Sequence, residues 1–285
     1  MTSASPTPSA DATIYIHGTD PDEQGRLSRL NDLLNARCLA EIRPEPGDCV
    51  LDLGSGLGQL SRAIARATGT RVVGVEFSPD QIEEASRQAR AAAEEHLVEF
   101  RRGDAANPPL APAEIGTFDL AHARFVLEHV TNPLAVVRAM VAAVRPGGRI
   151  VLADDDHDVL RLHPVPPGVH EAWSAYIRLY DRLGRDPFIG RRLVSLLKEA
   201  GADPVRNTWV WFGACSGNDE FEPIVRNMIR ILEGARMAIL DHTLTDAATF
   251  DRAIHGLNEF LRRDDAAVWF SMALAEGRKP ADQVR

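Results

Sequence analysis

Between residues 49 and 153, short apolar runs alternate with longer stretches in which apolar residues recur every three or four positions. Short apolar runs are typical of buried strands, and the longer repeat is typical of helices with one buried face. We predict strands at Cys49–Leu53, Arg71–Glu76, Val98–Arg102, Phe118–Ala123 and Arg149–Ala153. Helices are predicted between them at Gln59–Thr68, Pro79–Ala93 and Pro133–Val144. This alternation predicts a parallel sheet built from strand–helix–strand units.

The second half of the chain has longer helical stretches between fewer strands. Helices are predicted at Val169–Leu183, Gly190–Ala200, Glu220–Leu240 and Thr245–Leu261, and strands at Pro204–Phe212 and Ala267–Leu274. Segments inserted after the carboxyl ends of parallel strands lie where such sheets bind ligands. We therefore expect the two helical insertions to form a lid over a substrate.

A glycine-rich turn joins the first predicted strand to the first helix, in the run Val50-Leu-Asp-Leu-Gly-Ser-Gly-Leu-Gly58. A strand that turns through glycines into a helix presents backbone N–H groups and a positive helix end to a ligand. Dinucleotide-binding folds use G-x-G-x-x-G here, but this chain has Gln at position 59. Its spacing instead resembles the first motif of class I S-adenosylmethionine (SAM) dependent methyltransferases, with Gly54, Ser55 and Gly56 against the cofactor.

Acidic residues stand at the ends of the second and third predicted strands. Glu76 lies roughly 20 residues beyond the glycine turn, where a carboxylate hydrogen-bonds a ribose diol. The alternative is an exposed Glu that caps the helix beginning at Ser78 and Pro79. The run from Gly103 to Ala105 resembles the family's adenine contact, made by Asp104. The alternative there is an Asx turn.

The segment from Phe118 to Val130, in which F-D is followed after seven residues by L-E-H, resembles the family's fourth motif. The resemblance implies that Ala123 and Arg124 form the floor under the methionine part of SAM, with Phe125 beside the sulfonium. A positive sulfur near an aromatic ring is favourable for the same reason as a cation–π contact. For Glu128 and His129 we favour a pair that holds the start of a helix over a catalytic pair.

These motifs identify the chain as resembling class I SAM-dependent methyltransferases of the small-molecule type, similar to methyltransferase type 11 and ubiquinone-biosynthesis enzymes. The resemblance implies an α/β fold: a Rossmann-like, mostly parallel sheet of seven strands, with helices on both faces and helical lid insertions. It implies SAM as cofactor. It also suggests that Tyr15, His17 and Arg29 close over SAM, the alternative being a solvated helix surface. The full set of expected cofactor residues is Tyr15, Arg29, Gly54, Ser55, Gly56, Glu76, Phe77, Gly103, Asp104, Ala105, Ala123, Arg124 and Phe125.

This organisation divides the chain into seven expected segments. They are a disordered tail (1–12), an N-terminal helical cap (13–48), the SAM-binding core (49–155), a helical lid insertion (156–190), a continuation of the core (191–217), a second helical insertion (218–264), and the last core strand with a tail (265–285).

An acidic run with one histidine, Asp154-Asp-Asp-His157-Asp158, follows the fifth predicted strand. Three interpretations stay open: His157 as a general base oriented by a carboxylate, a divalent metal site, or a capping loop with solvated charges. We take His157 as the tentative catalytic residue and expect no metal.

Composition narrows the function. A net charge of -9 over 285 residues argues against a nucleic-acid surface, and no apolar run approaches the length that spans a bilayer. The first 11 residues lack the features of a signal peptide. We therefore expect a cytoplasmic monomer or homodimer that methylates a small-molecule acceptor at O, N or C, with secondary metabolism as a candidate setting. The alternatives are a methyltransferase acting on a macromolecule and a non-catalytic SAM-binding protein.

Overall fold

The computed structural model describes residues 31 and 34–281, whose strands form one eight-stranded sheet in the order β3-β2-β1-β4-β5-β8-β6, with β7 also paired to β8. The strands are β1 (Val50–Leu53), β2 (Val72–Glu76), β3 (Val98–Arg102), β4 (Phe118–Arg124), β5 (Val144–Asp155), β6 (Arg161–His163), β7 (Asp203–Cys215) and β8 (Ala267–Arg278). The strands β1 to β5 pair with one another in parallel, whereas β8 is antiparallel to β5, β6 and β7. The predicted α/β class is confirmed.

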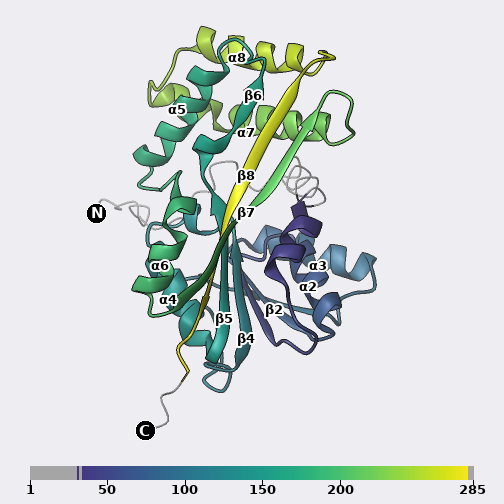
Figure 1. Ribbon diagram of the computed structural model, residues 1–285, viewed down its shortest axis with the longest axis vertical. Coiled ribbons are helices and arrows are strands. Elements are labelled where there is room, and N and C mark those ends of the chain that lie inside the picture. Colours follow the sequence, from purple (N-terminus) through teal and green to yellow (C-terminus); the bar gives the residue numbers. More distant parts are fainter. Residues whose placement is uncertain (1–30, 32–33, 282–285) are drawn as a thin grey trace, which may run out of the picture.

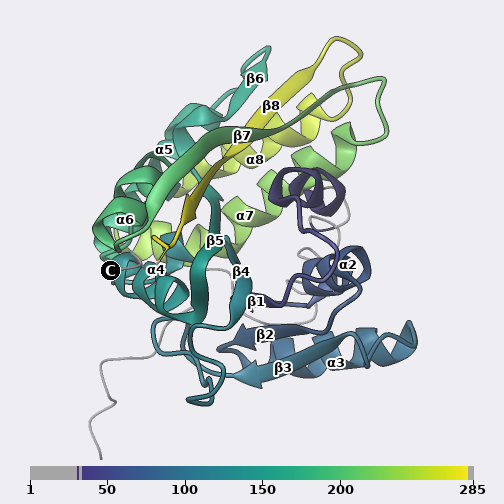
Figure 2. The same ribbon diagram turned by 60° about the horizontal axis from the view of Figure 1, so that its bottom comes forward.

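Helices cover both faces of the parallel part of the sheet (Figures 1 and 2). These helices are α2 (Gln59–Thr68), α3 (Pro79–Ala91), α4 (Pro133–Ala143) and α6 (Leu193–Glu199). Helical residues 34–42 pack with α2 over one face, where Leu34 and Ile64 are fully buried. The helices α4 and α6 pack together over the other face, through Met140 and Leu197.

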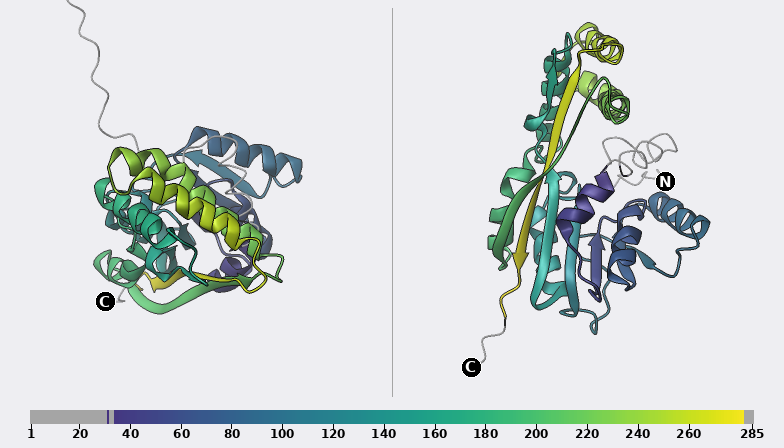
Figure 3. Two further views of the ribbon diagram at one scale, coloured as in Figure 1. Left: turned by 90° about the horizontal axis from the view of Figure 1, so that it is seen from above. Right: turned by 45° about the vertical axis from the view of Figure 1, so that its right-hand side comes forward.

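A third layer of helices lies beyond the carboxyl ends of the parallel strands. It is at the upper end of the molecule in Figure 1 and in the right-hand view of Figure 3. It consists of α5 (Val169–Arg182), α7 (Phe221–Asp241) and α8 (Ala247–Phe260), which share a core of their own containing Tyr176, Leu232 and Phe250. The long strand β8 joins the two parts, because its first residues pair with β6 and its last with β5. None of the helices in the described residues is long and apolar enough to cross a membrane.

Apart from shifted ends of helices and strands, the sheet differs from the sequence prediction in two details. The sheet has eight strands rather than seven, because Arg161–His163, expected within an insertion, pairs with the beginning of β8. The fifth strand begins at Val144 rather than after a turn at residues 145–148. These residues form a bulge, since Phe118 pairs with Val144 while Leu120 pairs with Arg149. A proline and two glycines signal a break in the chain, but a β-bulge accommodates them too.

The helix α8 packs closely against residues 164–168, the segment that leads into α5, and this contact fixes the positions of the upper helices. A Cβ on Gly256 would lie 2.7 Å from the carbonyl oxygen of Pro167, and one on Gly168 would lie 2.9 Å from the Ala253 nitrogen. No side chain fits between these backbones, so glycine at both positions sets the distance at which α8 crosses the 164–168 segment.

We expect Gly256→Ala to lower the free energy of unfolding by about 1–3 kcal/mol, because the added methyl must push the two backbones apart. In an unobstructed helix the same change would stabilise the protein by about 1 kcal/mol, so the sign of the effect is decisive. Urea unfolding measures it. Gly217→Ala is the matched control, since a Cβ there meets nothing within 4 Å. A Gly256→Ala protein at least as stable as the wild type would contradict this packing constraint.

Candidate active site

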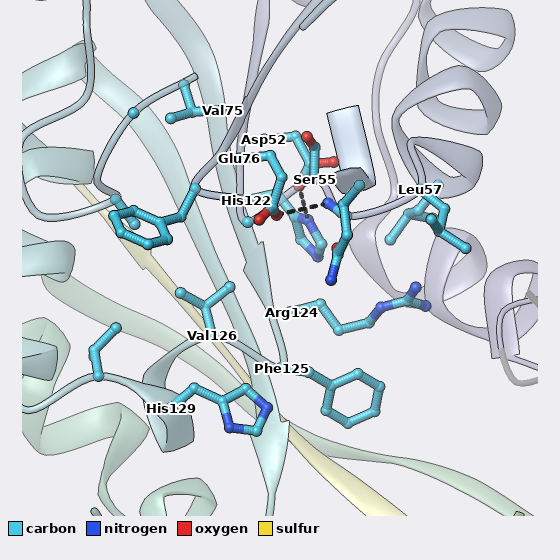
Figure 4. Close-up of a pocket in the computed structure, with 18 of the residues that line it drawn as sticks. Asp52, Ser55, Leu57, Val75, Glu76, His122, Arg124, Phe125, Val126 and His129 are labelled. Atoms are coloured by element: carbon cyan, nitrogen blue, oxygen red, sulfur yellow. Dashed lines mark hydrogen bonds and ion pairs between the residues drawn. The ribbon is translucent and has the colours of Figure 1, made fainter. Parts of the chain in front are cut away.

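A cavity opens at the carboxyl ends of β1, β2 and β4, where the strand order reverses between β1 and β4 (Figure 4). Ligands of open α/β sheets bind at such a reversal. The predicted residues that line this first cavity are Gly54, Ser55, Gly56, Glu76, Phe77, Gly103, Asp104, Ala105, Arg124 and Phe125. Ala123 is buried in the core and is not among the lining residues. Tyr15, His17 and Arg29 lie outside the described residues.

The sequence predicted a glycine turn that presents its N–H groups to a ligand, but those of Gly54, Ser55 and Gly56 are bonded within the protein. The Gly54 and Ser55 N–H groups both donate to the Val75 carbonyl oxygen, at 2.8 and 3.1 Å, and the Gly56 N–H donates to Glu76 Oε2 at 3.1 Å. The glycines are required for space and backbone conformation instead. Gly54 has a φ of 71°, and a Cβ there would lie 2.3 Å from Val126 Cγ2.

Glu76 is held rigidly at the end of β2, with only 2% of its surface exposed. Besides the Gly56 bond, its Oε1 accepts a hydrogen bond from the Ser78 N–H at 2.8 Å. Ser78 itself is the N-cap of α3. A carboxylate has lone pairs for further donors, so this anchored group can also receive hydroxyl hydrogens from the cavity.

Asp104 lies on the cavity wall and also forms the Asx turn that its sequence suggested as the alternative. Its Oδ1 accepts the Ala106 N–H at 2.9 Å. Phe77 lines the same part of the cavity with 44% of its surface exposed. The adenine contact of Asp104 stays a prediction.

Arg124 and Phe125 form the end of the cavity nearest the upper helices. The Arg124 guanidinium donates to Asn31 Oδ1 at 2.6 Å and to Asn35 Oδ1 at 3.1 Å, so it ties the N-terminal helical segment to the sheet. Phe125 has a φ of 55°, in the left-handed region that bulky residues rarely adopt. Its N–H is fixed by the Ala153 carbonyl oxygen at 3.0 Å, which keeps the ring at this position.

A second cavity lies between the sheet and the upper helices. Its walls are mainly apolar and aromatic, contributed by α5, α7, β7 and β8, and include Tyr176, Phe212, Ile224, Met228 and Phe270. Polar side chains also line it: Glu128, His129, Asp155 and His157 come from the segment after β4 and from the end of β5 and just beyond it, and Asn227 comes from α7. Phe125 and His129 line both cavities, so the two spaces adjoin at these side chains.

Glu128 connects the two histidines of this cavity. The His157 Nε2 lies 2.9 Å from Glu128 Oε2, and the His129 Nε2 lies 3.5 Å from Glu128 Oε1. Burial by itself raises the pKa of Glu128, but the charge of His129, the hydrogen bond from His157 and a bond to Tyr180 outweigh it and hold that pKa at about 2. Glu128 therefore remains a carboxylate that orients both rings.

The acidic run lies at the end of β5 and just beyond it, and most of it is buried rather than solvated. Asp156 caps the short 3₁₀ helix that follows, as the capping-loop interpretation expected, and only Asp158 is exposed. Asp154, Asp155 and His157 are buried, with 1%, 9% and 3% of their surfaces exposed. Burial, followed by the negative charge of Glu128, raises the pKa of both aspartates well above the ordinary value. Ligand atoms of Glu128, Asp155 and His157 lie within 4.8 Å of one another, close enough for one metal ion to contact all three. The absence of a metal stays a prediction.

Aromatic rings of α5 surround His157. The ring centroids of Trp173, Tyr176 and Tyr180 lie 5.8, 5.3 and 5.2 Å from its own. The Trp173 Nε1 also donates to the His157 carbonyl oxygen at 2.8 Å. The same rings line the second cavity. The sequence analysis did not identify Glu128 as the centre of this cluster. The motif L-E-H, which contains Glu128, was the only sequence feature that pointed to it.

The chain belongs to the methyltransferase domain family, whose model matches residues 23–207. It is 29% identical over 197 residues to the 27-O-demethylrifamycin SV methyltransferase of Amycolatopsis mediterranei, covering 66% of this chain and 66% of that protein. The chain spans only part of the length of the first curated relatives it matches: the match covers 52% of one relative and 66% of another.

Solved structures share the fold. The geranyl diphosphate C-methyltransferase of Streptomyces coelicolor, crystallised with Mg²⁺, geranyl diphosphate and S-adenosylhomocysteine, matches with a TM-score of 0.53 and 14% identity, over 91% of this chain and 86% of that one. The cyclase SpnF matches with a TM-score of 0.53 and 22% identity, over 89% of this chain and 81% of that one. The sheet is therefore that of class I methyltransferases, a fold that also hosts a cyclase.

The buried aspartates generate a prediction about stability. Because folding raises the pKa of Asp155 above 3.8, the folded protein keeps a proton that the unfolded chain has released, and stability falls as pH rises through this window. Asn cannot titrate, so Asp155→Asn is expected to be more stable than the wild type at pH 8, with little difference at pH 4. Urea unfolding at both pH values measures this.

The control for that measurement is Asp264→Asn, at an exposed position before β8. It should change stability little at either pH. Equal stability of Asp155→Asn and the wild type at pH 8 would show that burial of this carboxyl is not costly.

Proposed function

We propose that the protein is a SAM-dependent methyltransferase that methylates a hydroxyl oxygen of a small, largely apolar acceptor. The observation that carries this proposal is the junction of the two cavities at Phe125 and His129. A cofactor in the first cavity and an acceptor in the second would meet there, which is the arrangement that direct group transfer requires.

The first cavity fits SAM by its donors and acceptors. The anchored Glu76 carboxylate would accept the hydroxyl hydrogens of the ribose, and Phe77 and Asp104 would lie beside the adenine. When bound, SAM supplies an electrophilic methyl group on a sulfonium. The family match and the fold support this assignment.

The second cavity supports an apolar acceptor with one polar group. Its aromatic and aliphatic walls would bury the body of such a molecule, and the polar residues Glu128 and His129 lie next to the junction. The relative that methylates 27-O-demethylrifamycin SV is consistent with oxygen as the acceptor atom and with secondary metabolism.

A hydroxyl is a weak nucleophile until it loses its proton, so a base near the junction is needed. We assign this role to His129, because it lines both cavities. The base is the neutral form of the ring; with its hydrogen on Nε2, toward Glu128, the proton of the acceptor would go to Nδ1. His157, which the sequence suggested as the base, would act through Glu128 from within the second cavity.

A non-methylating SAM-binding protein is the competing function, because SpnF shows that this fold also serves a cyclase. Binding of SAM without methyl transfer to any of a panel of apolar phenols and alcohols would favour it. Transfer to a protein or RNA and to none of these small acceptors would favour a macromolecular substrate instead.

We expect Glu76→Gln to weaken SAM binding by about 1–3 kcal/mol, since the amide leaves the Gly56 and Ser78 N–H groups with a poorer partner and loses an acceptor for the ribose. Isothermal titration with SAM measures the change. Glu83→Gln, on the exposed side of α3, is the matched control and should bind like the wild type. Wild-type affinity in a folded Glu76→Gln protein would remove Glu76 from the ribose site.

We expect His129→Ala to lower methyl transfer by about 10²–10⁴-fold while SAM affinity is largely retained, because a positioned base contributes that much to rate. Radiolabelled methyl transfer to the acceptor panel measures the rate, and titration measures binding. His157→Ala should have a smaller effect. The reverse order, with His157→Ala the more damaging, would identify His157 as the base.

A further inference from the structure

A buried histidine lies under the first cavity, with one ring nitrogen fixed and the other without a partner. His122 of β4 is fully buried, and its Nδ1 lies 3.0 Å from Asp52 Oδ1 on the neighbouring strand β1. Asp52 is held in turn by Ser61, whose Oγ donates to Asp52 Oδ2 at 2.6 Å. The His122 Nε2 is buried and has no hydrogen-bond partner among the described residues.

This pattern fixes which hydrogen-bonding group His122 offers. An ionised carboxylate only accepts hydrogen bonds, so the ring hydrogen of the neutral imidazole lies on Nδ1, toward Asp52. The Nε2 atom is then an acceptor. A buried acceptor without a donor costs free energy, and such groups in folded proteins are usually explained by a ligand or an ordered water.

The position of His122 indicates which part of a ligand it would meet. Glu76 and Asp104, at the ends of β2 and β3, mark the side proposed for the adenosine. His122 is on β4, which is separated from β2 by β1. Figure 4 shows its ring between Asp52 and Arg124. A ligand that extends from β2 across β1 therefore places its amino-acid end over β4.

We propose that His122 is a specificity-determining residue for the amino-acid end of the cofactor, with Nε2 accepting a hydrogen bond from the α-ammonium group of SAM. Asp52 and Ser61 keep the ring in the required orientation. This proposal rests on the proposed function, because it presumes SAM in the first cavity. It adds an acceptor for the ammonium group, which the backbone N–H groups of the glycine turn, being donors, cannot provide.

The test compares three ligands by isothermal titration: S-adenosylhomocysteine, its analogue without the α-amino group, and 5′-methylthioadenosine, which lacks the amino-acid end. The variant is His122→Asn, whose amide reaches the position of Nδ1 toward Asp52 but not that of Nε2. We expect it to bind S-adenosylhomocysteine at least tenfold more weakly than wild type, about the value of one hydrogen bond to a charged group. Its affinity for 5′-methylthioadenosine should be unchanged, which also shows that the variant is folded.

His122→Gln, whose amide reaches the position of Nε2, should restore part of the affinity. On the wild type, removal of the α-amino group should weaken binding by a similar factor, and on His122→Asn by little. Equal losses for S-adenosylhomocysteine and 5′-methylthioadenosine, or no loss for either, would overturn the role of His122 and leave the proposed function intact. Failure of the wild type to bind any of these ligands would instead overturn the proposed function.

Discussion

The structure depends on the burial of charged and polar side chains at the carboxyl ends of its parallel strands. Asp52, Glu76, His122 and Asp154 all lie within the sheet or at its end, each with 3% or less of its surface exposed. Such groups are costly to bury without partners. The glycine turn, the start of α3 and the segment after β4 supply those partners, so the local conformation around the first cavity follows from the need to satisfy these side chains.

Two carboxylate–histidine pairs result, one for each cavity. Asp52 holds His122 beneath the first cavity, and Glu128 holds His157 in the second. In both pairs the carboxylate fixes the ring, so the remaining nitrogen has a defined direction. His129, between the cavities, shares Glu128 with His157. The proposed reaction needs both properties: a cofactor fixed at its charged end and a base fixed beside the acceptor.

Much of the parallel core could be predicted, because each strand and helix there carries its own local signal. The helix Gln59–Thr68 and the strand Val98–Arg102 agree with the prediction at both ends. Prediction failed where pairing partners decide. The three residues of β6 form a strand because β8 extends past β5, and residues 145–148 stay in a strand because a bulge absorbs them.

The sequence by itself determined the family, the fold class and most of the first cavity, since its motifs lie within short stretches whose spacing is fixed by strand and turn geometry. It did not reveal that the Gly54, Ser55 and Gly56 N–H groups are bonded within the protein. Nor did it reveal that Glu128 joins two histidines 28 residues apart, His129 and His157. Only the tertiary structure decided the second cavity, because its walls come from α5, α7, β7 and β8. Contacts between such distant segments depend on packing, which no local pattern records.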